Sequence, residues 1–192
     1  MHTMESLDKS YKDYFKFFME LAPPKFTRYG YDSGRPNGMA ASLESLIYFA
    51  NIVKDTDALI LNAGAGASSW VLRQLFPRVI CADPDAEYLD LIRELCRKHG
   101  LQSQGFVHLL RNTPDIDYTF YDYGHYEVRW PMLSVAWSKT RKSMYVDDAD
   151  DRPHNMPNRH YALALAQELS IATEDCRQAI DGYGRWGILY HR

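Results

Sequence analysis

The first quarter of the chain carries apolar residues at helical spacing. Lys9–Ala22 has its large apolar side chains three and four residues apart, which predicts a helix that ends before Pro23. A second helix is predicted to begin at Ser42, a residue type that favours helix N-termini, and to present one apolar face up to Val53. We expect residues 1–55 to form a helical cap on the rest of the protein.

From residue 58 onward, short apolar runs alternate with longer segments of helical periodicity. Short runs that are apolar throughout are typical of strands buried on both faces. The pattern predicts strands at 58–62, 78–82, 106–110, 118–121 and 143–146, helices at 69–76, 85–99, 127–137 and 161–170, and a closing hairpin of 176–180 with 185–190. Such alternation predicts an α/β fold, a doubly wound, Rossmann-like, mostly parallel seven-stranded sheet with a C-terminal antiparallel hairpin. We expect one domain, 1–192, with residues 56–192 as its α/β core.

Composition narrows the class of protein. Of the 192 residues, 46% are hydrophobic and 24% are charged, which is the balance of a soluble globular domain. A net charge of −3 and the lack of a long Lys/Arg run argue against a nucleic-acid partner. No apolar run approaches the ~20 residues of a membrane span, and Met1–Ser10 lacks the apolar region of a signal peptide. Three scattered cysteines predict reduced thiols in a cytoplasmic protein.

A turn of small residues follows the first predicted core strand. In Asn62–Ser69, glycines and alanines let a ligand approach the backbone, and the helix start beyond them offers free N–H groups. Asp83 ends the second strand, 19 residues after Gly64, where a carboxylate can accept hydrogen bonds from two ribose hydroxyls. Dinucleotides and S-adenosylmethionine share that requirement. The alternative is a structural turn followed by a helix-capping aspartate.

The turn favours S-adenosylmethionine over a dinucleotide as the cofactor. A nicotinamide fingerprint has a third glycine, which lets helix and strand pack closely, whereas this chain has a serine there. Leu59–Ser69 (LILNAGAGASS) and Val79–Leu89 (VICADPDAEYL) instead resemble the first two motifs of the class I S-adenosylmethionine-dependent methyltransferases. Asp122 with His125–Glu127, and Val146–Ala149, resemble small-molecule O-methyltransferases of the catechol and macrocin type.

The resemblance implies a role for each motif residue. Asp83 would hold the ribose of S-adenosylmethionine. Asn62 stands where the family usually has an acidic residue near the cofactor's ammonium group. The residues implied to contact the methionine end are Ala63, Gly64, Ala65 and Ser68 or Ser69. The link from Leu110 to Asp117 is too short for the family's crossing helix, since six residues span at most ~20 Å, so we expect that helix to be missing or reduced to a turn.

Three acidic residues end the fourth and fifth predicted strands. Asp122 follows the fourth, and Asp147 and Asp148 follow the fifth, so all three open on one crevice. Their carboxylates would repel one another unless protonated or bridged by a cation, and oxygen ligands suit Mg²⁺ or another divalent cation. Metal-dependent O-methyltransferases, by resemblance, hold such an ion there. The alternatives are an ordinary acidic turn, and contact of Asp122 with the cofactor's methyl region without a metal.

His125 is the candidate base. It lies three residues after Asp122, at the mouth of the crevice, where a neutral imidazole can take the proton of a substrate hydroxyl. The alternative is a surface or helix-capping histidine. The other six histidines share no spacing and are interpreted as structural or solvent-facing. The loop Arg152–Arg159 is expected on the acceptor side.

These features predict an S-adenosylmethionine-dependent methyltransferase that acts on a hydroxyl of a small molecule, with or without a divalent metal ion. Asp122 and His125 are the expected catalytic residues. The alternative is a non-catalytic, methyltransferase-like binding module, which the amide at Asn62 and the short link after Leu110 favour. The expected partner is a small-molecule acceptor rather than nucleic acid or a membrane, and a homodimer is left open.

Overall fold

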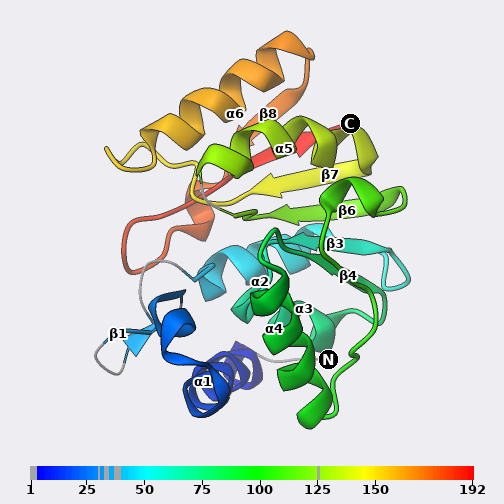
Figure 1. Ribbon diagram of the computed structural model, residues 1–192. Helices are drawn as coiled ribbons and strands as arrows, with labels where there is room; N and C mark the ends of the chain where they lie inside the picture. Colours follow the sequence, from blue (N-terminus) through cyan, green and yellow to red (C-terminus); the bar gives the residue numbers. More distant parts are fainter. Residues whose placement is uncertain (1–3, 30, 33–34, 37–39, 125) are drawn as a thin grey trace.

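The computed structural model describes residues 4–29, 31–32, 35–36, 40–124 and 126–192 (Figure 1). A seven-stranded sheet runs through it in the order β5-β4-β3-β6-β7-β9-β8. The strands are β3 (Ile60–Ala63), β4 (Val79–Ala82), β5 (Phe106–Val107), β6 (Ile116–Tyr121), β7 (Thr140–Val146), β8 (Ala172–Asp175) and β9 (Ile188–His191). The first five are parallel, and β9 runs antiparallel to both of its neighbours. The predicted sheet is confirmed, and its strand order reverses between β3 and β6.

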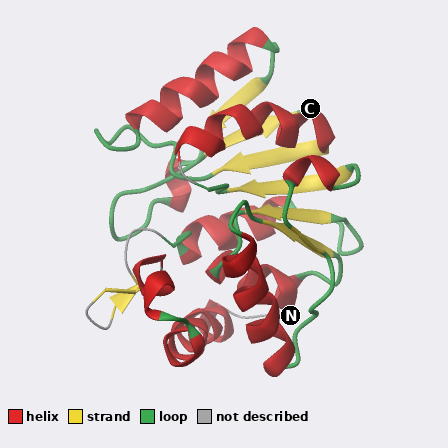
Figure 2. Cartoon of the chain, viewed as in Figure 1, coloured by secondary structure: helices red, strands yellow, loops and turns green. Residues whose placement is uncertain are grey.

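Helices cover both faces of this sheet (Figure 2). They are α1 (Met4–Leu21), α2 (Leu43–Ile52), α3 (Ala67–Leu75), α4 (Ala86–Lys98), α5 (Tyr126–Lys139) and α6 (Met156–Glu168). Because successive side chains of a strand point to opposite faces, Ile60 is buried among α1 to α4 and its neighbour Leu61 among α5 and α6. This two-sided burial explains the apolar runs in the sequence. None of the described helices has the length and apolar character of a bilayer span.

The N-terminal helices α1 and α2 pack against α3. Phe15 of α1 is buried in the same apolar cluster as Leu72 of α3 and Ile92 of α4, and α1 lies outside these two helices (Figure 1). Ser42 caps α2 as expected, since its hydroxyl accepts a hydrogen bond from the N–H of Ser45 at 3.0 Å. Between α1 and α2 lie a 3-10 helix, η1 (Pro24–Tyr29), and two short paired strands, β1 (Tyr31–Asp32) and β2 (Arg35–Pro36).

The first strand of the closing hairpin lies elsewhere than predicted. It is β8, at 172–175, whereas Arg177–Ala179 within the predicted segment 176–180 form a 3-10 turn, η3. β8 is an edge strand whose first three side chains are exposed, so it lacks the apolar alternation of a half-buried strand. Cys176 and Ala179 are buried, which gave the neighbouring segment its apolar pattern. The second strand of the hairpin is confirmed as β9, which begins at Ile188 instead of at residue 185.

The link between β5 and β6 contains a single 3-10 turn, η2 (Leu110–Asn112). The N–H of Thr113 closes this turn by donating to the carbonyl of Leu110 at 3.0 Å. The strand predicted at 106–110 is therefore cut to two residues, because its last apolar residue enters the turn. The crossing helix is reduced to a turn, as the short link implied.

Candidate functional site

A cavity of about 910 Å³ opens at the carboxyl ends of the parallel strands. Ligands bind at this place in doubly wound sheets, and the volume lies within the range of small-molecule pockets, roughly 300–1,000 Å³. Its walls include Gly64 and Ala65 after β3, Asp83 after β4, His108 after β5, Asp122 after β6 and Asp148 after β7. The strand ends that the sequence analysis singled out thus share one cavity.

Gly64 lets the first turn approach the end of β6. Its φ is +105°, and its N–H donates to the carbonyl of Ala82 at 2.7 Å. A Cβ at this position would lie 2.0 Å from the carbonyl oxygen of Asp122, which is backbone and has little room to move. The close approach of the ends of β3 and β6 therefore requires a glycine at this position, whether or not a ligand also contacts it.

Asp83 joins the first turn to the start of α4. One carboxylate oxygen accepts a hydrogen bond from the N–H of Ala65 and the other from the N–H of Asp85, both at 2.9 Å. Burial raises the pKa of Asp83 to about 7, although both hydrogen bonds oppose the shift. The residue that caps α4 is Asp85, whose side chain accepts from the N–H of Tyr88. Asp83 is therefore not the helix cap of the alternative interpretation.

The remaining predicted residues of the turn are buried, and three of them are joined by hydrogen bonds within it. Asn62 is fully buried, and its Nδ2 donates to the hydroxyls of Ser68 at 3.0 Å and Ser69 at 2.8 Å. Its Oδ1 has no hydrogen-bond partner among the described residues. Asn62, Ala63 and Ser69 lie outside the described lining of the large cavity, whereas Ser68 lines a hollow of about 30 Å³ formed by the same turn.

The three acidic residues come together at the ends of β6 and β7. Asp122, Asp147 and Asp148 each place a carboxylate oxygen within 4.8 Å of the others. Asp122 and Asp148 line the cavity, whereas Asp147 is 2% exposed and accepts a hydrogen bond from the hydroxyl of Ser45 in α2 at 3.1 Å. Burial and the neighbouring Asp148 raise the pKa of Asp147 well above its usual range.

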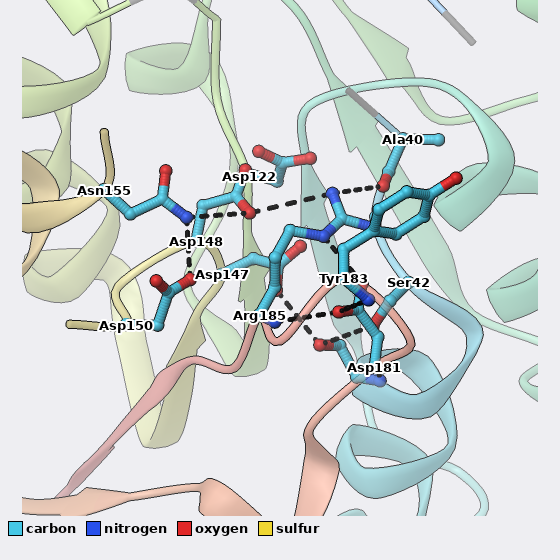
Figure 3. A network of polar contacts seen from close by, with 12 residues as sticks. Ala40, Ser42, Asp122, Asp147, Asp148, Asp150, Asn155, Asp181, Tyr183 and Arg185 are labelled. Atoms are coloured by element: carbon cyan, nitrogen blue, oxygen red, sulfur yellow. Dashed lines mark hydrogen bonds and ion pairs between the residues drawn. The ribbon is translucent and has the colours of Figure 1, made fainter. Parts of the chain in front are cut away.

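Two arginines that the sequence analysis did not single out balance this cluster. Nη2 of Arg129, on α5, donates a hydrogen bond to Asp122, and its Nη1 lies 3.9 Å from a carboxylate oxygen of Asp148. Nη1 of Arg185 lies 3.8 Å from the other oxygen of Asp148, and its Nε donates to Asp181 at 2.6 Å (Figure 3). Burial raises the pKa of Asp122, and the charge of Arg129 opposes that shift.

This arrangement does not fit the divalent metal ion that the acidic residues predicted. The Arg129 guanidinium already binds Asp122, and it would repel a second cation close by. Asp147 accepts from Ser45, and its burial favours the protonated carboxyl, which is a poor metal ligand. In the described residues, the acidic cluster is balanced by protein side chains.

The histidines are distributed differently from the prediction. His125, the candidate base, lies outside the described residues. His108 and His154, interpreted as structural or solvent-facing, both line the cavity. His108 directly follows β5 as Asp83 follows β4, so its place after a strand end was the signal that could have revealed it. Asn155 and His154 lie before α6, and both line the cavity.

No family model and no curated protein matches this chain, but solved structures do. The O-methyltransferase from Bacillus cereus, in complex with SAH, matches with a TM-score of 0.61 and 14% identity over 97% of this chain and 100% of that chain. The precorrin-6y C5,15-methyltransferase from Geobacter metallireducens matches with a TM-score of 0.61 and 14% identity over 81% and 92%. A methyltransferase from Geobacter sulfurreducens matches with a TM-score of 0.55 and 15% identity over 80% and 83%.

At these identities the likeness concerns the fold. The shared fold agrees with the strand order of the sheet. The fold that the resemblance implied is thereby confirmed. The chain has the fold of the class I S-adenosylmethionine-dependent methyltransferases.

Proposed function

We propose that this protein is an S-adenosylmethionine-dependent methyltransferase that acts on a hydroxyl of a small molecule. The observation that carries the proposal is Asp83, a buried carboxylate in the wall of a cavity large enough for a cofactor and a small acceptor. Each of its oxygens accepts one backbone hydrogen bond and keeps capacity for another. Two adjacent ribose hydroxyls match that pair of oxygens.

The described residues fit the cofactor in shape and charge. Gly64 and Ala65 offer a wall with no side chain beyond a Cβ, beside Asp83. The described lining of the cavity holds two arginines, Arg129 and Arg185, and five acidic residues, which are Asp83, Asp85, Glu87, Asp122 and Asp148. The excess of acidic residues, on the side of Asp83, suits a cationic ligand. When bound, S-adenosylmethionine supplies an electrophilic methyl group on a positively charged sulfur.

Residues of α5 and of the loop before α6 offer a place for the acceptor. Val128, which is 37% exposed, adds an apolar surface to the cavity, and His154 and Asn155 add polar groups. In the proposed reaction, His125 takes the hydroxyl proton as the new carbon–oxygen bond forms and the carbon–sulfur bond breaks. Asp122 and Asp148 line the same cavity. The charge-balanced cluster supports a reaction without a divalent metal ion.

Calorimetric titration with S-adenosylhomocysteine tests the cofactor. The wild-type protein is expected to bind it, and Asp83→Asn is expected to bind at least about tenfold more weakly, because a charge-assisted acceptor is lost. Asp90→Asn, a change of an exposed acid on α4, is the matched control and keeps the wild-type affinity. Absence of binding to folded wild-type protein at millimolar ligand would contradict the proposal.

A binding module without turnover is the second candidate. The buried amide of Asn62 and the reduction of the crossing helix to η2 favour it. It predicts binding of S-adenosylhomocysteine with no methyl transfer to any hydroxyl acceptor. Loss of turnover by roughly 10²–10⁴-fold in His125→Ala, with cofactor affinity retained, supports catalysis instead. His160→Ala, a change of an exposed histidine on α6, is the control for that variant.

A further inference from the structure

Arg129 occupies the acidic cluster at the ends of β6 and β7. Its side chain is 12% exposed and comes from α5, the helix that follows Asp122 in the chain. Its Nη2 donates to Asp122, and its Nη1 lies 3.9 Å from Asp148. One guanidinium thus reaches acidic residues at the ends of two strands. A divalent ion bound by these carboxylates would need that same space.

The positive charge of Arg129 is held in place. A guanidinium stays charged at any ordinary pH, and the carboxylates of Asp122 and Asp148 lie beside this one. Without it, the acidic cluster would contain three neighbouring carboxyl groups with no cation from α5. Removing one partner of such a buried set leaves strong repulsion among the others.

Arg129 also has N–H donors that make no hydrogen bond to the described residues. A guanidinium has five N–H donors. Its Nη1 is beyond hydrogen-bond distance of Asp148, and its Nε is buried with no partner among the described residues. Because Arg129 lines the cavity, its positive charge lies next to whatever the cavity binds. A metal ion supplies a charge of this kind in metal-assisted transfer.

Arg185 also lies near the cluster, 3.8 Å from Asp148, but its hydrogen bonds go to other residues. Its Nε donates to Asp181 at 2.6 Å, and its Nη1 donates to the carbonyl of Ala40 at 3.0 Å (Figure 3). These contacts tie the segment before β9 to the segment before α2. The cation that bonds directly to the end of β6 is Arg129.

We propose that Arg129 is a built-in cation that takes the place of a divalent metal ion at Asp122, Asp147 and Asp148. The proposal refines the proposed function, because methyl transfer in this cavity would then need no metal. Its evidence is independent of that function, because it consists of the contacts around the guanidinium. Its test therefore needs neither cofactor nor turnover.

Manganese binding to the full chain, followed by the electron paramagnetic resonance signal of free Mn²⁺, tests the proposal. Wild-type protein is expected to leave the Mn²⁺ signal unchanged. Arg129→Gln is expected to bind one Mn²⁺ at least about tenfold more tightly than wild type, because Asp122 and Asp148 lose the cation that lies between them. The double variant, which carries both Arg129→Gln and Asp148→Asn, should bind Mn²⁺ as weakly as the wild-type protein does.

Arg159→Gln is the matched control. It removes a half-buried arginine that pairs with Asp175 outside the cluster, and it is expected to leave Mn²⁺ binding as in wild type. If Arg129→Gln is only marginally folded, Mn²⁺ should raise its melting temperature and leave that of wild type unchanged, since the metal replaces the missing charge.

Two results would overturn the proposal. One is wild-type protein that binds a single Mn²⁺ and loses it in Asp148→Asn. The other is an Arg129→Gln protein that gains neither Mn²⁺ binding nor stabilisation by Mn²⁺. Failure of the proposed function is a separate result, since it would appear as wild-type protein that does not bind S-adenosylhomocysteine.

Discussion

A glycine at position 64 has two explanations, approach of a ligand to the backbone and contact with a neighbouring strand end, and the sequence alone does not distinguish them. The glycine turn predicted a ligand site, and the structure adds a backbone contact between the turn and Asp122. Gly64→Ala is expected to lower the free energy of unfolding by roughly 3 kcal/mol, because a Cβ strains a positive φ and meets backbone. Urea denaturation measures this change.

The matched control for Gly64 is Gly100. Gly100 also has a positive φ, +73°, but a Cβ there would meet nothing within 4 Å. Gly100→Ala should therefore cost only about 1 kcal/mol, the cost of the backbone conformation itself. Equal losses in the two variants would show that the contact with Asp122 contributes nothing.

Asp83 predicts a pH dependence of stability. Its pKa in the folded protein is about 7, above the ordinary value of 3.8, so between these values the folded state binds a proton that the unfolded state releases. The stability contributed by protonated Asp83 is therefore present at acidic pH and is lost as the pH rises through about 7. Asp83→Asn should reduce the fall in unfolding free energy between pH 5 and pH 7.5 by about 2 kcal/mol.

Urea denaturation at these two pH values measures that fall. Asp122 and Asp147 also have raised pKa values, so part of the slope should remain in Asp83→Asn. Asp90→Asn, on the surface of α4, is the control and should keep the whole wild-type slope. A slope in Asp83→Asn as steep as in wild type would assign the effect to other groups.

At the scale of elements, the start of α2 is bonded to the end of β7. Ser42 accepts from the N–H of Ser45, and the hydroxyl of Ser45 donates to Asp147. Ser42→Ala is expected to lower the free energy of unfolding by about 1 kcal/mol, the usual cost of a lost N-cap. Ser138→Ala, near the exposed end of α5, should stay within about 0.5 kcal/mol of wild type.

The elements differ in how far the sequence predicts them. α4 is confirmed almost to the residue, because Tyr88, Leu89, Ile92 and Leu95 form a continuous apolar face and Asp85 caps it. β8 is missed, because an edge strand with exposed side chains carries no apolar pattern. β5 is shorter than predicted, because an apolar residue is buried equally well in a turn as in a strand.

At the scale of the whole molecule, the cavity links residues from both sides of the reversal in strand order. Asp83 lies on one side, and Asp122 and Asp148 on the other. A ligand that contacts both sides stabilises the folded state. S-adenosylhomocysteine at a hundred times its Kd should add about 2.7 kcal/mol, which raises the melting temperature by roughly 5–10 °C for a chain of this length.

Differential scanning calorimetry measures that rise. Asp83→Asn at the same ligand concentration should show a smaller shift, because its affinity is lower. Adenosine-free S-methylmethionine serves as the control ligand, since it lacks the ribose that Asp83 is proposed to hold. A shift of equal size in Asp83→Asn would place the ligand elsewhere.

The sequence by itself determined the alternation of strands and helices, the glycine turn, Asp83 at a strand end and the grouping of Asp122 with Asp147 and Asp148. These features are local, since they depend on periodicity, on backbone conformation and on the rule that parallel strands end at one edge. Tertiary structure decided the charge balance of the site. Arg129 and Arg185 reach the acids from α5 and from the segment before β9, and such pairings depend on packing in space, which no local pattern encodes.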